Sequence, residues 1–295
     1  MKENCPENHG LCENGREKPE NPFCFKIKNG FSASGWNLLS VAFPENLFRM
    51  CLIVFAWHVK PGTPLIAASN RDEFYARPAI PAHRWQDHPQ IYAGRDLEGG
   101  GTWLGVAHGK NGRGNRFAAL TNVRAPHLMK ENAPTRGLLV SNYLASNLTP
   151  EEYIREIRHE SYHYNGFNLL VGDGDTMIWY SNFGMMNPKN GMPLKPGIYG
   201  LSNALLDDPW PKVVRTRAQF ASLLGINAPE EAYFEMLSDT TKAPDRLLPH
   251  TGVSYEWEKL LSSVCIESDD YGTRASTLVE LYNDEPPVLH ERVIR

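Results

Sequence analysis

A cysteine at position 51 directly follows a methionine and begins a short apolar run, residues 51–57. If the working protein begins at Cys51, a single residue carries both a thiol nucleophile and a free α-amine. The pKa of such an amine is about 8, which suits it to accept the thiol proton at neutral pH. We therefore expect Cys51 to be a nucleophile at the start of a buried strand. Free cysteines also serve as small buried hydrophobes, and that structural role stays open.

Four consecutive polar residues, Asn70, Arg71, Asp72 and Glu73, follow a second apolar run. A thiol that transfers acyl groups needs charged groups beside its amine or thiolate. We expect Asp72 to orient the α-amine of Cys51, and Arg71 to stabilise the thiolate or a substrate carboxylate. Asn70 and Glu73 are expected to contact the substrate. A structural salt-bridge cluster at the end of a strand is the alternative.

Residues 70–73 form one of six blocks that resemble the NRDE family, also called the transport and Golgi organisation protein 2 family. The other blocks follow in the family's order at residues 100–105 (GGTWLG), 119–122 (ALTN), 164–169 (YNGFNL), 199–205 (YGLSNAL) and 271–274 (YGTR). The resemblance covers about residues 50–295. It implies an α+β fold, the four-layer αββα sandwich of antiparallel sheets found in N-terminal nucleophile hydrolases such as penicillin V acylase and bile-salt hydrolase.

The resemblance also implies roles for three later residues. Asn203 resembles the amide of the oxyanion hole in those hydrolases, where an uncharged NH₂ donor suits an anionic intermediate. Arg274 matches their late catalytic arginine, and Asn122 is a weaker candidate of the same type that we group with the substrate-binding residues. The structural alternatives are a turn at Asn203 and a structural arginine at Arg274. In bile-salt hydrolases the block corresponding to residues 70–73 is Arg-Asn-x-Asp, so Arg and Asn are transposed here.

Two functions follow from these expectations. The first is cofactor-free hydrolysis of linear amide bonds by Cys51. The second is a non-catalytic carrier or chaperone for heme, or for a lipid-like or acyl-CoA-like anion, because family members are associated with heme trafficking and a lipid role. In the second case heme is a transported ligand. Ten histidines, eight methionines and 11% aromatic residues would supply ligands and stacking surface, although a packed core uses the same residue types.

Two other motifs are expected to be structural. Residues 159–163 spell HExxH, which binds zinc only when one helix places both histidines on the same face. Here Asn165 and Gly166 end the helical pattern, so we expect no metal site. The glycine run at 99–101 lacks the Lys-Ser/Thr of a phosphate-binding loop and leads into a strand. We expect it to allow close backbone packing.

Composition restricts the partners of the chain. A net charge of −4 in 295 residues gives no broad attraction to phosphate backbones, so nucleic acid is not expected as a partner. No apolar run approaches the ~20 residues that span a bilayer, and no signal-peptide pattern is present. Five cysteines without CxxC spacing fit a reducing compartment. We expect a cytoplasmic protein with a small-molecule partner, and its oligomeric state stays open.

The chain divides near Met50. Residues 1–49 are mostly polar and are expected to lie outside the core. They form a disordered extension, a propeptide, or a segment included by assigning the start upstream of Met50; we favour the last. Residues 50–295 are expected to form one domain.

Periodicity supplies the elements that would position these residues. Strands are predicted at 51–57, 65–70, 102–107 and 117–122, and an Asp-Gly turn joins a hairpin of 167–171 and 177–180. Helices are predicted from a capping box at Thr149 to about residue 159, over 210–224, and from 227–230 to about 237. The final strands are predicted at 263–266, 275–281 and 288–293.

Overall fold

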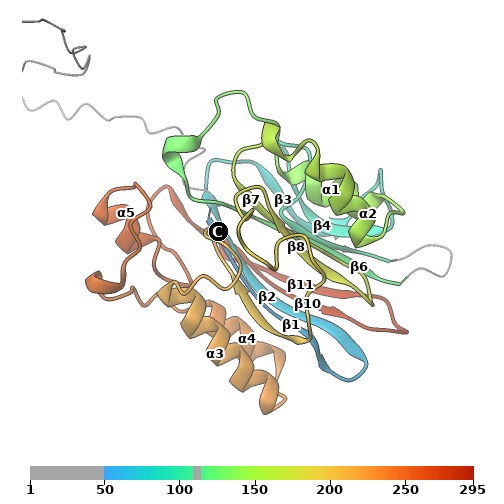
Figure 1. The fold of residues 1–295 in the computed structure, drawn as a ribbon. Coiled ribbons are helices and arrows are strands. Elements are labelled where there is room, and N and C mark those ends of the chain that lie inside the picture. The colour runs from blue at the N-terminus through green and yellow to red at the C-terminus, as the bar shows by residue number, and fades with distance from the viewer. Residues whose placement is uncertain (1–49, 109–113) are drawn as a thin grey trace, which may run out of the picture. The chain divides into compact units, whose positions relative to one another are not determined.

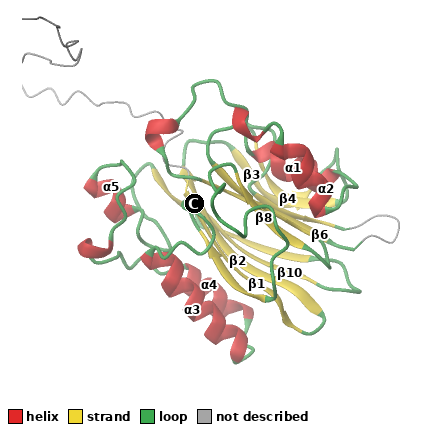
Figure 2. Cartoon of the chain, in the orientation of Figure 1, coloured by secondary structure: helices red, strands yellow, loops and turns green. Residues whose placement is uncertain are grey.

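The computed structural model describes residues 50–108 and 114–295. The expectations for residues 1–49 lie outside the described residues, as do residues 109–113. The described chain is α+β and contains two antiparallel sheets (Figures 1 and 2). The first, in hydrogen-bonded order, consists of β11 (Val288–Val293), β10 (Tyr271–Leu281), β2 (Thr63–Phe74), β1 (Met50–Lys60) and β9 (Gly197–Leu201). The second consists of β3 (Ala79–Arg84), β4 (Ile91–Asp96), β5 (Leu104–Ala107), β6 (Arg116–Asn122), β7 (Phe167–Gly172) and β8 (Met177–Ser181).

Helices pack on the outer face of each sheet (Figure 1). Thr149 forms the predicted capping box with Glu152 at the start of α2. The described α-helices are α1 (Gly137–Ala145), α2 (Pro150–Arg158), α3 (Pro211–Gly225), α4 (Glu230–Leu237) and α5 (Tyr255–Leu260). Short 3₁₀ turns are η2 (Pro126–Leu128), η3 (Ser161–His163) and η4 (Asp245–Leu247).

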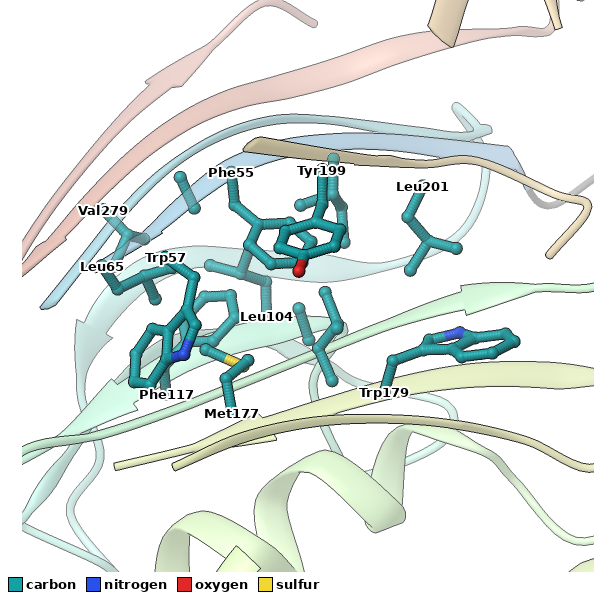
Figure 3. Close-up of a cluster of buried hydrophobic side chains, with 14 of the residues drawn as sticks. Phe55, Trp57, Leu65, Leu104, Phe117, Met177, Trp179, Tyr199, Leu201 and Val279 are labelled. Atoms are coloured by element: carbon teal, nitrogen blue, oxygen red, sulfur yellow. The ribbon is translucent and has the colours of Figure 1, made fainter. Parts of the chain in front are cut away.

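The two faces of β1 bury different cores, because successive strand residues point to opposite sides. Phe55 and Trp57 lie between the sheets with Phe117 and Trp179 (Figure 3). The alternate residues Leu52, Val54 and Ala56 instead pack under α3 and α4. A third apolar cluster joins α1 and α2 to the outer face of the six-stranded sheet. The order of layers is therefore helix, sheet, sheet, helix. By the same alternation, the Cys51 side chain lies on the face between the sheets.

Most predicted elements are present, with one correction and several omissions. The prediction of a strand at 263–266 is wrong: these residues form no strand, although Val264, Cys265 and Ile266 are buried. The segment looked like a strand because it is apolar, and its burial comes from packing under the five-stranded sheet. Periodicity did not predict β3, β4, β9, α1 or α5.

Among the described residues, the helices are all too short or too polar to cross a membrane.

Candidate functional site

Cys51 lies near the start of β1, one of the central strands of its sheet. It is opposite Arg71 in β2. On its other side, two residues of the segment that follows β9 contact its backbone. Ser202 Oγ donates to the Cys51 carbonyl oxygen at 2.9 Å, and the Cys51 backbone nitrogen donates to Asn203 Oδ1 at 3.4 Å. The thiol is half-buried and lines a cavity of about 60 Å³. The geometry thus places Cys51 where β1, β2 and the segment after β9 meet.

The electrostatic surroundings keep the Cys51 thiol protonated in the chain described here. Burial raises its pKa to about 12; Asp72 also raises it, and Arg71 lowers it by less. In this chain the Cys51 nitrogen is part of a peptide bond, so it cannot accept the thiol proton. A thiol needs a lowered pKa or an adjacent base to act as a nucleophile. Burial thus disfavours the reactive thiolate of Cys51 in this chain.

Arg71 is the cation whose charge lowers the thiol pKa, and it lies on the face between the sheets. Its guanidinium carbon lies 4.3 Å from the centroid of the Trp103 ring, and its Nη2 is 3.8 Å from Glu73 Oε2. Burial lowers the pKa of Arg71, while Glu73 raises it. Both Arg71 and Glu73 line the cavity, as expected. Arg77, which the sequence did not suggest, links Glu73 to Asp96 through ion pairs of 3.7 and 2.7 Å.

Asp72 points mainly to the other face of the sheet, toward the helices. One carboxylate oxygen, Oδ1, accepts a hydrogen bond of 2.6 Å from the Thr273 hydroxyl. The other, Oδ2, has no hydrogen-bond partner among the described residues. Burial raises the pKa of Asp72 to about 6, and Lys212 is the largest influence that opposes this rise. Asp72 also borders the cavity beside Cys51. Its expected role, to orient a free amine at Cys51, stays a prediction.

Asn203 and Asn122 lie together on the side of the site opposite β2. Asn203 Oδ1 accepts from the Cys51 nitrogen, and its Nδ2 donates to the Asn122 carbonyl oxygen at 2.8 Å. Its own carbonyl accepts from the Arg124 nitrogen at 2.8 Å. Asn122 lines the cavity. Asn203 thus contacts the candidate nucleophile, as expected of a residue at the reacting centre; its role as an oxyanion donor stays a prediction.

Three of the expected site residues do not line this cavity: Asn203, which is linked to it through Cys51 and Asn122, and Asn70 and Arg274, which lie away from it. Asn70 is on the helix side of β2, where its Nδ2 donates to the carbonyl oxygens of Leu237 at 2.8 Å and Val264 at 2.9 Å. Arg274 lies in a bulge of β10 and binds backbone carbonyls, including that of Phe74 at 3.3 Å. Arg274 lines a separate cavity of about 160 Å³ that also touches Arg71. These contacts are structural, and substrate contacts by either residue stay a prediction.

The far wall of the cavity comes from residues that sequence reasoning did not select: Trp103, and the segment Thr135, Arg136 and Gly137 at the start of α1. A Cβ on Gly101 would lie 2.4 Å from the Gly137 carbonyl carbon, so the glycine run allows the close backbone approach that we expected. The GGTWLG block at residues 100–105 was a signal that could have indicated Trp103, because a large aromatic residue stands just after the glycines. Nothing in the local sequence marked Arg136.

The HExxH segment does not form one helical face. Helix α2 ends at Arg158, His159 caps it, and His163 belongs to the separate turn η3. A search of the described residues finds no group of three or more His, Cys, Asp or Glu side chains that could hold a metal ion. The expected presentation of the two histidines is confirmed, and the absence of zinc stays a prediction.

A larger cavity, of about 630 Å³, lies beside β8, the edge strand of the six-stranded sheet. Tyr162, Tyr164, Tyr180 and Phe183 line it, together with Lys130 and Arg158. The Arg158 guanidinium lies 5.8 Å from the centroid of the Tyr180 ring. No acidic residue is among the described residues that line this cavity. It combines aromatic surface with positive charge, and the sequence analysis gave it no role.

Comparison with known proteins identifies the family. Residues 50–295 match the model of the family described as Transport and Golgi organisation 2. The chain is 37% identical to the Transport and Golgi organization protein 2 homolog of Bos taurus over 264 residues, covering 82% of this chain and 92% of the bovine protein. Identity to the Homo sapiens homolog is 34% over 264 residues, with the same coverage of 82% and 92%. Identity to Transport and Golgi organization protein 2 of Drosophila melanogaster is 28% over 253 residues, or 78% and 87% of the two chains. The sequence resemblance is thereby confirmed, and the chain belongs to the Transport and Golgi organisation 2 family, the NRDE family.

Proposed function

We propose that this protein is an N-terminal nucleophile hydrolase that cleaves linear amide bonds with Cys51, without a cofactor, once the chain begins at that residue. One observation carries the proposal: the Cys51 nitrogen already makes a hydrogen bond to Asn203, while its thiol borders a cavity beside Arg71. Two face-to-face antiparallel sheets between helix layers support an N-terminal nucleophile fold. If the chain began at Cys51, the peptide nitrogen that Asn203 binds would become an α-amine bound by the same side chain.

The chemistry then follows from the positions of the groups. The neutral α-amine accepts the thiol proton, and Sγ attacks the substrate carbonyl carbon to form a tetrahedral intermediate. The resulting α-ammonium gives its proton to the leaving nitrogen, the C–N bond breaks, and a thioester remains on Cys51. Water then attacks the thioester and releases a carboxylic acid. Arg71 offers a positive charge to the thiolate, and Asn203 an amide to the oxyanion.

The raised thiol pKa in the uncut chain supports this proposal as well. A chain whose Cys51 nitrogen is acylated has a half-buried thiol with a raised pKa and no terminal base, so it would be latent. Trimming supplies the base at the point where the site is already assembled. Both cysteines in the described part of the chain, Cys51 and Cys265, are unpaired. This is compatible with the cytoplasm, where thiols stay reduced.

The test compares two chains that differ only in where they begin. A chain started at Met50 loses that methionine during expression, and intact mass confirms that it begins at Cys51; the 295-residue chain is the matched control. The trimmed chain should react stoichiometrically with a thiol-directed acylating agent near pH 7 and hydrolyse members of an acyl-amide panel. The 295-residue chain should do neither at a comparable rate. Equal activity in both chains eliminates the terminal-amine mechanism.

A second candidate, a carrier of an apolar anion, is favoured by the large aromatic cavity. The cavities at Arg71 and Arg274 are about 60 and 160 Å³, below the ~300 Å³ at which ligand pockets usually begin. The cavity lined by Tyr162, Tyr180 and Arg158 is about 630 Å³, large enough for heme or for part of an acyl chain. If the protein is a carrier, we place its ligand there.

Hemin and oleate are suitable probes for the carrier function. Titration should show saturable binding that weakens when Arg158 is reversed to Glu and is unchanged in Arg274→Glu, the matched control in the small cavity. Loss of binding in Arg274→Glu alone would place the ligand in the smaller cavity that Arg274 lines. The absence of saturable binding by either probe would remove this candidate.

A further inference from the structure

Lys212 is a buried lysine that the proposed chemistry has not yet used. It occupies the first turn of α3 and is 2% exposed. Its Nζ has no hydrogen-bond partner among the described residues. The helix macrodipole makes a cation unfavourable at this end of α3, and a buried ammonium without partners is costly. A nearby negative charge is therefore needed to explain why the protein keeps Lys212 here.

Asp72 supplies that charge from beyond hydrogen-bonding distance, since neither Lys212 Nζ nor Asp72 Oδ2 has a hydrogen-bond partner among the described residues. It lies on the helix side of the five-stranded sheet and is 1% exposed. The two groups favour each other's charged form. Burial lowers the pKa of Lys212 to about 8 and Asp72 raises it; burial raises the pKa of Asp72 to about 6 and Lys212 lowers it. Between those values, at pH 7, Lys212 is an ammonium and Asp72 a carboxylate.

The other charges around Lys212 come from four parts of the chain, and they leave Asp72 as its counter-charge. Arg124, after β6, forms a buried ion pair with Glu258 of α5, with Nη1 and Oε2 2.5 Å apart. This pair is neutral as a unit, and its cation lowers the pKa of Lys212. The remaining groups are Cys51 of β1, whose thiol is protonated, and Tyr271 of β10, whose pKa burial raises well above the usual value.

A free amine on Cys51 would form next to this pair. Met50 is opposite Asp72 in the β1–β2 ladder, and Asp72 is the residue whose charge most raises the thiol pKa. An unpaired carboxylate beside an amine favours the ammonium form, which cannot accept a proton from the thiol. When Lys212 neutralises the Asp72 carboxylate, Asp72 no longer strongly favours the ammonium form of the amine. An ammonium at Cys51 would also be a third charge in a buried cluster, which is disfavoured.

We propose that Lys212 is a positioning residue of the Cys51 site: its ammonium neutralises Asp72 and so keeps the terminal amine of Cys51 a neutral base. This inference rests on the proposed function for its purpose, since only a chain that begins at Cys51 has the amine. The protonation state that it specifies is a property of the folded chain and is measurable without any substrate.

The experiment uses residues 50–295, which contain both sheets and all five described helices and match the whole family model. Initiator methionine removal exposes residue 51, and Cys51→Ala removes the competing thiol. An amine-directed reagent, trinitrobenzenesulfonate, is applied from pH 5 to 10, and modification of the terminal amine is quantified by peptide mass. Far-UV circular dichroism and thermal melting confirm that each variant is folded.

Lys212→Met should raise the midpoint of the labelling curve by about 1 pH unit or more, because an unpaired carboxylate within ~4–6 Å shifts an amine pKa by about 1–3 units. Lys212→Arg keeps the charge and should leave the midpoint near that of the parent. Asp72→Asn should lower the midpoint, and adding Asp72→Asn to Lys212→Met should reverse the rise. A purely structural lysine would move none of these midpoints. Equal midpoints in the parent and Lys212→Met overturn the inference.

Failure of this inference can be separated from failure of the proposed function by assaying acyl-amide hydrolysis in the same chains with Cys51 restored. Shifted midpoints without hydrolysis in any chain mean that Lys212 sets the amine charge and that the hydrolase proposal is wrong. Hydrolysis with unshifted midpoints means that the hydrolase proposal stands and that Lys212 plays no part in it.

Discussion

The backbone nitrogen of Cys51 lies 3.4 Å from the side-chain oxygen of Asn203, 152 positions along the chain. The contact joins the start of β1 to the segment that leaves β9, its neighbour in the sheet. Because the contact involves the nitrogen and not the thiol, a residue-51 amine would inherit the hydrogen bond. The position of the base is thus fixed by the fold before any amine exists.

The thiol pKa of about 12 predicts how the 295-residue chain responds to alkylation. Only the thiolate reacts, so labelling of Cys51 by iodoacetamide should be slow at pH 7 and rise about tenfold per pH unit up to at least pH 10. Peptide mapping separates Cys51 from the other four cysteines. A plateau below pH 9 would show that the thiol is more acidic than its surroundings imply.

Replacing Asn203 by Ala tests its role in the trimmed chain. If its amide faces the developing oxyanion, the variant should lower kcat by about 10²- to 10³-fold, the usual effect of losing one such donor. The matched control is Asn142→Ala, at an exposed asparagine of α1. A turnover unchanged in Asn203→Ala, with the melting temperature lowered, would assign Asn203 a structural role only.

Asp72 should make the stability of the protein depend on pH in an unusual direction. Its pKa is about 3.9 in an unfolded chain and about 6 in the folded one. Between these values the folded state binds more protons, so the contribution of Asp72 to stability falls as pH rises from about 4 to about 6. Urea unfolding of the parent and Asp72→Asn should show the Asn variant gaining relative stability across this interval. A constant difference between the two chains would contradict the raised pKa.

The accidental nature of the HExxH segment predicts its metal content. His159 and His163 belong to different turns, so the purified protein should hold no stoichiometric zinc and should melt at the same temperature with or without chelator. About one zinc per chain, lost in His159→Ala, would show instead that a metal site forms.

The sequence predicted the parts of the fold that local patterns specify. The capping box at Thr149 and the Asp-Gly hairpin at 173–174 define their own ends, and α2, β7 and β8 formed as predicted. Strand β3 was not predicted because it lies at a sheet edge and is only partly buried, so its sequence lacks an apolar pattern. Its partner β4 was not predicted either. Residues 263–266 were wrongly predicted as a strand. A segment that packs under a sheet and a strand within a sheet both appear in the sequence as a short apolar run.

The site was predicted unevenly for a similar reason. Family blocks indicated Cys51, Arg71 and Asn203, and in the structure Cys51 shares a cavity with Arg71 and bonds to Asn203. They could not show that Asn70 faces the helices, since that depends on which face of β2 each residue takes. The burial of Lys212 could not be predicted from the sequence, because a lysine in the first turn of an amphipathic helix usually lies in solvent. Only the packing of α3 on the sheet shows that it is buried.

Gly101 offers a test of whether the far wall of the cavity must stay where it is. A Cβ at this position would lie 2.4 Å from the Gly137 carbonyl carbon and 2.5 Å from its oxygen, and backbone atoms cannot move aside as a flexible side chain can. Gly101→Ala should therefore destabilise the protein by about 1–3 kcal/mol, the range for overpacking a close contact, and should push the start of α1 away from Cys51. The matched control is Gly174→Ala, where a Cβ meets nothing within 4 Å and the change should stay within about 0.5 kcal/mol. Denaturant unfolding measures both variants, and thiol labelling of the trimmed chain reports on the site. If Gly101→Ala is as stable and as reactive as the Gly174 control, α1 tolerates displacement, and its first turn has no part in shaping the cavity.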